Sequence, residues 1–264
     1  MNELLLHLGI VWMTSVLAMS AVWYIQKRTG NAGFVDVAWA ALLGVAALYY
    51  GVVADGALLP RLVVALLAAS WGFRLALHLL HRVLNEEEDG RYAHLRAHWQ
   101  GHQGKFFLFF QAQALAVGLF SLPFLVAASN PVPELTATIT LGICVWLASL
   151  VGESIADLQL ARFRSNPRNR GKTCRDGLWR YSRHPNYFFE WLHWFAYVCL
   201  AWGSPWFVLS LIGPALMLVS LCWVSGIPFV QAQSLRSRGD DYRDYQRTTS
   251  PLIPWFPRKS RDPR

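Results

Sequence analysis

Long apolar runs separated by short polar connections dominate this chain. Seven stretches qualify, at about 4–25, 34–53, 59–81, 106–128, 135–160, 187–203 and 205–230. A run of roughly 18 or more apolar residues predicts a transmembrane helix. The pattern therefore predicts an all-α, polytopic helical bundle with seven spans. The sixth run is short and ends at Gly203-Ser204-Pro205, so six spans are the main alternative.

Composition supports a membrane protein rather than a soluble one. Of 264 residues, 54% are hydrophobic and 15% are charged, whereas soluble domains carry about 25% charge. The 13 Trp residues suit membrane interfaces. We expect no signal peptide, because no basic segment precedes the first run and the first Lys is Lys27. We predict a single integral-membrane domain over 1–264, with a flexible tail at 257–264.

Basic residues fall in alternate connections. Of the 24 Lys and Arg residues, all except Arg61 and Arg74 lie after the first, third, fifth or seventh run. The positive-inside rule then places the N-terminus outside and the C-terminus in the cytoplasm. We expect a bacterial inner membrane or endoplasmic reticulum location. Topology explains the net charge of +8, so we predict no nucleic-acid partner; anionic lipid headgroups are a simpler one.

Polar groups inside the runs form three stripes at helical spacing. Ionisable groups within spans are costly and are usually functional. Because each stripe begins near the predicted cytoplasmic side, we expect a polar cavity that opens inward. The alternative is that these groups only pair with one another across the bundle. The stripes are Arg74, His78 and His81; Glu153, Asp157 and Arg164; and Asn186, Glu190 and His193.

Two kinds of site are not predicted. His94, His98 and His102 recur every four residues, but without a fourth ligand they indicate a solvated helix face rather than a metal site. The four Cys residues form no close pair, so neither a disulfide nor zinc is expected.

Neither a Rossmann glycine motif nor a P-loop occurs, so a nucleotide would be held in another way.

The segment from Gly177 to Glu190 reads GLWRYSRHPNYFFE. It resembles the steroid 5α-reductase family, in the bacterial branch also described by a domain of unknown function. Sterol reductases share the core Arg-His-Pro-Asn-Tyr at 183–187, and isoprenylcysteine carboxyl methyltransferases have a looser form. The segments at 36–39, 71–75, 89–92, 157–164 and 242–254 also match the reductase branch. The resemblance covers about residues 30–256.

The resemblance implies an NADPH-dependent enzyme that reduces the Δ4 double bond of a lipophilic, steroid-like 3-oxo substrate. Its cofactor would lie within the bundle near the cytoplasmic side. Arg suits phosphate binding through bidentate contacts, and Asn186 with Glu190 could hold the nicotinamide carboxamide. No obligate protein partner is evident. Carried over, the cofactor contacts are Arg74, Asn85, Arg91, Tyr92, Asp157, Arg164, Tyr181, Arg183, His184, Asn186 and Glu190.

The group that polarises the substrate ketone differs from the family pattern. The mammalian Gln-Glu pair has no counterpart here, and Trp71 replaces the Tyr. We expect Asp36 to take this role, since a carboxyl group in an apolar site can stay protonated and donate. A surface carboxylate near the membrane boundary is the simpler interpretation of Asp36. Glu190 is a further catalytic candidate, and His78 and Tyr187 are substitutes for Asp36.

Two other functions stay open. A lipid or isoprenoid methyltransferase would use S-adenosylmethionine and would not need Arg residues around a 2′-phosphate. A transporter or other non-enzymatic membrane protein would place polar residues near the midplane from both faces.

Overall fold

A computed structural model describes residues 2–224 and 226–258. Helices form most of this part of the chain, and an isolated bridge between Ser182 and Ser250 is its one β-pairing. The predicted all-α class is therefore confirmed. The chain divides into two compact units. The first comprises Met1–Thr140 and Tyr197–Gly213, and the second comprises Leu141–Ala196 and Pro214–Arg264.

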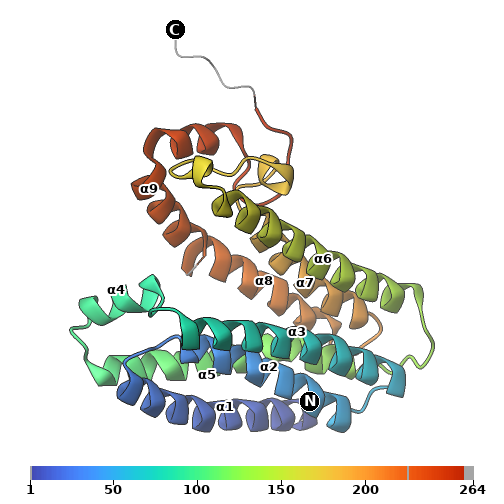
Figure 1. Cartoon of the computed structure of the whole chain (residues 1–264). Coiled ribbons are helices and arrows are strands. Elements are labelled where there is room, and N and C mark those ends of the chain that lie inside the picture. The colour runs from blue at the N-terminus through green and yellow to red at the C-terminus, as the bar shows by residue number, and fades with distance from the viewer. Residues whose placement is uncertain (1, 225, 259–264) are drawn as a thin grey trace. The chain divides into compact units, whose positions relative to one another are not determined.

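The first unit is built on four long helices, which lie side by side in Figure 1. They are α1 (Asn2–Thr29), α2 (Phe34–Val53), α3 (Leu58–Asn85) and α5 (Gln103–Ala128). The short helix α4 (Gly90–His98) connects α3 to α5, and the 3-10 helix η3 (Phe207–Leu211) closes the unit.

Helices α2 and α3 approach closely where two glycines meet. A Cβ atom on Gly72 would lie 2.8 Å from the Ala40 carbonyl oxygen and 2.9 Å from the Gly44 nitrogen. Small residues allow helix backbones to approach in this way within a membrane. The pair thereby sets the distance between the two helices.

Arg61, one of the two basic residues outside the predicted charge pattern, caps a helix. It donates to the carbonyl oxygens of Gly51 and Val52 at 3.0 and 2.5 Å. These carbonyls lie at the C-terminal end of α2, where backbone acceptors lack helical partners and a cation is favourable. Local capping therefore accounts for this charge.

The second unit contains the motif at 177–190. It is formed by α6 (Ala137–Ser165), η1 (Pro167–Asn169), η2 (Gly177–Arg180), α7 (Pro185–Leu200), α8 (Ile212–Val219), the π-helix η4 (Ser220–Val224) and α9 (Ile227–Thr248). Both α6 and α7 extend by a few residues into the first unit. Helix α9 is broken at Gly239, where φ is +52°.

Among the described residues, six helical segments are long and apolar enough to cross a membrane: α1, α2, α3, α5, α6 and the stretch Phe207–Thr248. They are consistent with an integral, multi-pass membrane protein. The predicted sixth span is α7, which has 16 residues and at 1.5 Å per residue is shorter than a hydrocarbon core of about 30 Å. The total of seven spans, with α7 as the sixth, stays a prediction, as do the orientation of the termini and the single domain. Of the tail predicted at 257–264, residues 259–264 lie outside the described part of the chain.

Candidate functional site

The predicted site residues fall into two sets, one in each unit. Asp36, Arg74, His78, Asn85, Arg91 and Tyr92 belong to the first unit, and Asp157, Arg164, Tyr181, Arg183, His184, Asn186, Tyr187 and Glu190 belong to the second.

In the first unit the structure brings Asp36, Arg91 and Tyr92 together. The Asp36 carboxylate, near the start of α2, accepts hydrogen bonds from Arg91 Nη2 at 3.1 Å and from the Tyr92 hydroxyl at 2.6 Å. Both carboxylate oxygens are therefore engaged. The proposed role of Asp36 as a protonated donor to a ketone stays a prediction, and it requires these two partners to move.

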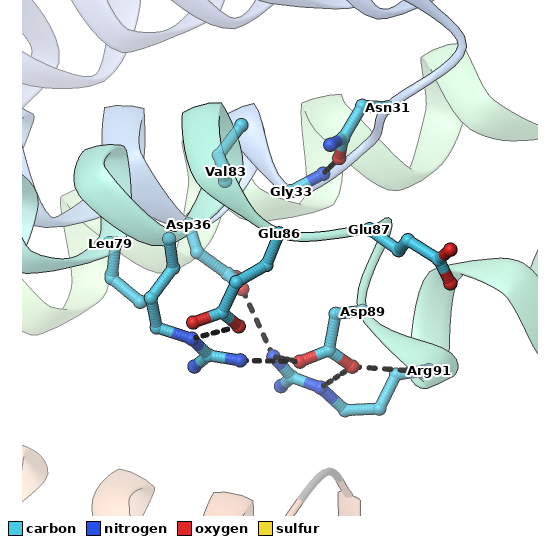
Figure 2. A pocket seen from close by; sticks show the side chains of 10 residues that line it. Asn31, Gly33, Asp36, Leu79, Val83, Glu86, Glu87, Asp89 and Arg91 are labelled. Carbon is cyan, nitrogen blue, oxygen red and sulfur yellow. Dashed lines mark hydrogen bonds and ion pairs between the residues drawn. The ribbon is translucent and has the colours of Figure 1, made fainter.

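Asp89 also binds Arg91, as Figure 2 shows. The Asp89 carboxylate caps α4 by accepting from the Arg91 backbone N–H at 2.9 Å, and it also accepts from Arg91 Nε at 3.1 Å. Burial alone would raise the pKa of Asp89, but the hydrogen bonds from Arg91 outweigh burial and lower it. Arg82 continues the network with contacts to Glu86 at 3.4 Å and to Asp89 at 3.7 Å. The network thus ties the end of α3 and the start of α4 to α2.

The connection between α3 and α4 contains four consecutive acidic residues, Glu86 to Asp89, and ion pairs hold it in place. Glu88 binds Arg96 at 2.7 Å and accepts from the Ala32 backbone N–H at 2.7 Å. These contacts hold α4 against the connection between α1 and α2. Of the other predicted residues in this unit, Arg74, His78 and Asn85 are exposed on α3, and Asn85 donates to the His81 carbonyl oxygen at 2.7 Å.

In the second unit, the motif loop is fixed to α6 and to the chain after α9. Trp179 Nε1 donates to the Ala156 carbonyl oxygen at 2.9 Å. The Ser182 hydroxyl donates to the Leu252 carbonyl oxygen at 2.7 Å, and the Arg183 N–H donates to Ser250 at 2.8 Å. The Tyr245 hydroxyl donates to the carbonyl oxygens of Trp179 and Ser182. The motif is therefore held from both sides before α7 begins.

His184 is a buried, neutral imidazole. Burial and, to a lesser extent, the neighbouring charge of Arg183 lower the pKa of His184 to about 3. Its ring stacks on Tyr187 with centroids 5.4 Å apart. Gln231 Nε2 lies 3.5 Å from His184 Nε2, and Gln246 donates to Gln231 at 2.9 Å. Gln231 and Gln246, both on α9, were not among the predicted site residues.

Asn186 and Asp157, which belong to two of the polar stripes, are hydrogen-bonded to each other, the kind of contact that the pairing alternative describes. Asn186 Nδ2 donates to Asp157 Oδ1 at 3.1 Å, and Asn186 Oδ1 accepts from the Tyr187 N–H at 3.0 Å. Glu190 lies one turn further along α7 and is half-buried. The orientation of the Asn186 amide is thus fixed, and each of its polar atoms can still make one further hydrogen bond.

An open cavity of about 650 Å³ lies within the second unit. It is formed by the end of α6, the loop around η1 and the first half of α9. No carboxylate is among the described residues that line it. Its polar lining consists mainly of Arg164, Asn166, Asn169, Arg170, Lys172 and Arg238.

A hydroxyl group and an aromatic ring position Arg238, one of the cavity's cations. Arg238 donates to the Ser234 hydroxyl at 2.8 Å and lies 5.3 Å above the Tyr242 ring. Tyr242 also interacts electrostatically with Arg183, whose pKa is lowered by burial. Arg164 was predicted from sequence, whereas Arg170, Lys172 and Arg238 were not. The sequence did show that these connections are rich in basic residues. The positive-inside rule accounted for that charge, so it did not indicate a binding site.

Comparison with known families agrees with the motif. Residues 22–249 match the family described as protein of unknown function (DUF1295). The chain belongs to the DUF1295 family. This family includes steroid 5α-reductase-like proteins. Comparison of the DUF1295 chain with curated proteins and with solved structures gave no significant match.

Proposed function

We propose that this DUF1295 protein is a membrane-embedded, NADPH-dependent reductase. It transfers a hydride to the C4=C5 double bond of a 3-oxo-Δ4 steroid or of a similar lipophilic enone. The observation that carries the proposal is the basic cavity of the second unit, with four cationic side chains and no carboxylate among its described lining residues.

The chemistry of this cavity fits the phosphates of NADPH. The cofactor carries a pyrophosphate and a 2′-phosphate, and several Arg side chains can bind such groups through bidentate contacts. S-adenosylmethionine is positively charged at its sulfonium and carries no phosphate. A cavity lined by Arg164, Arg170, Lys172 and Arg238 therefore favours NADPH over the methyl donor.

The motif on α7 offers groups for the nicotinamide end. The carboxamide of nicotinamide both donates and accepts, and the Asn186 side chain can do both with its remaining hydrogen-bonding capacity. Asp157 fixes that side chain at 3.1 Å. When bound, NADPH supplies the hydride, and the residues of the chain bind and orient it. The neutral His184 adds no second positive charge beside Arg183.

A ligand panel tests the proposal on the detergent-purified chain. Thermal unfolding would be followed with NADPH, NADH or S-adenosylmethionine, and NADPH oxidation would then be measured with a 3-oxo-Δ4 steroid. We expect the largest stabilisation from NADPH and a smaller one from NADH. Stabilisation by S-adenosylmethionine alone would contradict the reductase and favour the methyltransferase.

A further inference from the structure

The chain after α9 forms an ordered segment that is not helical. We call residues 249–258 the C-terminal strap. Its backbone accepts from Arg183 N–H and the Ser182 hydroxyl, as described above, and Trp255 N–H donates to the Tyr181 carbonyl oxygen at 2.9 Å. The Arg258 N–H returns to the Thr248 carbonyl oxygen at 2.8 Å. The strap therefore has a defined conformation and lies directly on the motif loop.

The outer side of the strap is apolar and uncovered. Ile253, Trp255 and Phe256 are 55%, 71% and 77% exposed, whereas Leu252 is buried. Pro254 and Pro257 flank the aromatic pair and restrict its backbone. Three neighbouring large apolar side chains on a fixed backbone are typical of a surface that binds something apolar.

The charge around this patch indicates which apolar partner it meets. Arg258 ends the described strap and is exposed, and the sequence continues with Lys259, Arg261 and Arg264 against a single Asp262. Aromatic residues beside basic ones are typical of segments that lie in the interface of an anionic bilayer. Six described helical segments are apolar enough to span a membrane. A chain held in a bilayer by these helices has the bilayer surface nearby. A second copy or another protein would not need the flanking positive charge.

We propose that the C-terminal strap binds the interfacial region of an anionic lipid bilayer through Ile253, Trp255, Phe256 and Arg258. Trp255 and Phe256 would lie among the headgroups and upper acyl chains. Arg258 would pair with lipid phosphates. Since the same strap is bonded to Tyr181, Ser182 and Arg183, the membrane surface would also hold the motif loop in place.

Hydrogen exchange of the strap amides, measured by mass spectrometry on the full chain, tests this proposal. The chain would be placed in nanodiscs of phosphatidylcholine, in nanodiscs of equal parts phosphatidylcholine and phosphatidylglycerol, and in neutral detergent. We expect exchange to be slowest with phosphatidylglycerol, by roughly fivefold for each basic residue that reaches the surface. Exchange that is the same in all three surroundings would overturn the proposal, as would protection that rises with protein concentration in detergent.

Variants separate lipid binding from folding of the strap. Trp255→Ser combined with Phe256→Ser removes the apolar patch, and Arg258→Glu reverses one charge while the patch stays intact. Both are expected to reduce the effect of phosphatidylglycerol. Trp202→Ser is the matched control, because Trp202 is also an exposed tryptophan, at 60%, but belongs to the first unit. A lipid effect that survives both strap variants would exclude the strap as the binding surface.

Discussion

The side-chain amide of Asn186 donates a hydrogen bond to the carboxylate of Asp157 at 3.1 Å, across 29 positions of the sequence. This contact joins the first turn of α7 to α6. It leaves the Asn186 amide oriented, with one N–H and one lone pair still available. In the proposed reductase these groups face the nicotinamide carboxamide.

Asp157 is expected to act by positioning Asn186. Asp157→Asn keeps an oxygen that can accept from Asn186, whereas Asp157→Ala removes it. We therefore expect Asp157→Ala and Asn186→Ala each to weaken NADPH binding by about tenfold, equivalent to one hydrogen bond of about 1.4 kcal/mol, and Asp157→Asn to retain most of it. NADPH titration of the purified variants measures this. Equal affinities for all three would remove this pair from the cofactor site.

Asp36 is expected to hold α4 in place. Asp36→Asn removes the charge that binds Arg91 and Tyr92. Both Asp36 and Arg91 are about one-third exposed, at 29% and 33%, so solvent screening limits the loss to about 1 kcal/mol. Amides of α4 should then exchange roughly fivefold faster, since local opening becomes easier by that amount.

Glu87→Gln is the control for Asp36, because Glu87 lies in the same connection and is exposed. It should leave exchange in α4 unchanged. If Asp36→Asn also leaves it unchanged but abolishes turnover of a 3-oxo-Δ4 steroid, Asp36 serves the reaction rather than the fold.

His184 should make stability depend on pH. Its pKa is lowered from an ordinary value of 6.5 to about 3 in the folded chain. Between these values the unfolded chain binds a proton that the folded chain does not, so stability falls as pH falls. The slope approaches 1.4 kcal/mol per pH unit. Thermal unfolding between pH 7.5 and pH 5 should show this slope in the wild type and lose it in His184→Gln; an equal slope in both would contradict the buried, neutral imidazole.

Gly72 should tolerate no side chain. A Cβ atom there meets backbone atoms of α2 at 2.8 and 2.9 Å, which cannot move as a flexible side chain could. We expect Gly72→Ala to cost about 1–3 kcal/mol of unfolding free energy. Gly9→Ala, where nothing lies within 4 Å, should be neutral or slightly stabilising. Thermal unfolding of the two variants compares them, and equal stabilities would refute the close helix crossing.

Hydrophobic pattern predicted most of the helices, because lipid-length apolar runs have few alternatives to a helix. The predicted run 34–53 coincides with α2, whereas α3 continues past the run at 59–81 to Asn85. Its last turns contain His81 and Arg82, which end the apolar pattern without ending the helix. Helices α4 and α9 were less predictable, since they are polar and are held by contacts such as Glu88–Arg96 and Arg175–Asp241. The second of these pairs joins residues that are 66 positions apart in sequence.

Prediction of the site is limited in the same way, because contacts between distant residues cannot be read from local sequence pattern. Helical spacing brought out Asp157, Asn186 and Arg164, because each belongs to a polar stripe on an apolar helix. Arg238 belongs to a segment rich in charge, where a functional cation does not differ in pattern from a solvated one. Only the folded second unit shows that Arg238 lines the same cavity as Arg164.

Equilibrium binding of NADPH to the detergent-purified wild type and to Arg164→Ala, Arg238→Ala and Arg168→Ala tests the central claim most directly. Arg168 belongs to the same basic loop but does not line the cavity. We predict that the wild type and Arg168→Ala bind NADPH alike. Arg164→Ala and Arg238→Ala should each bind at least about tenfold more weakly, because each loses a charged hydrogen bond to phosphate. No binding by the wild type, or equal binding by all four proteins, would contradict a nucleotide site in this cavity.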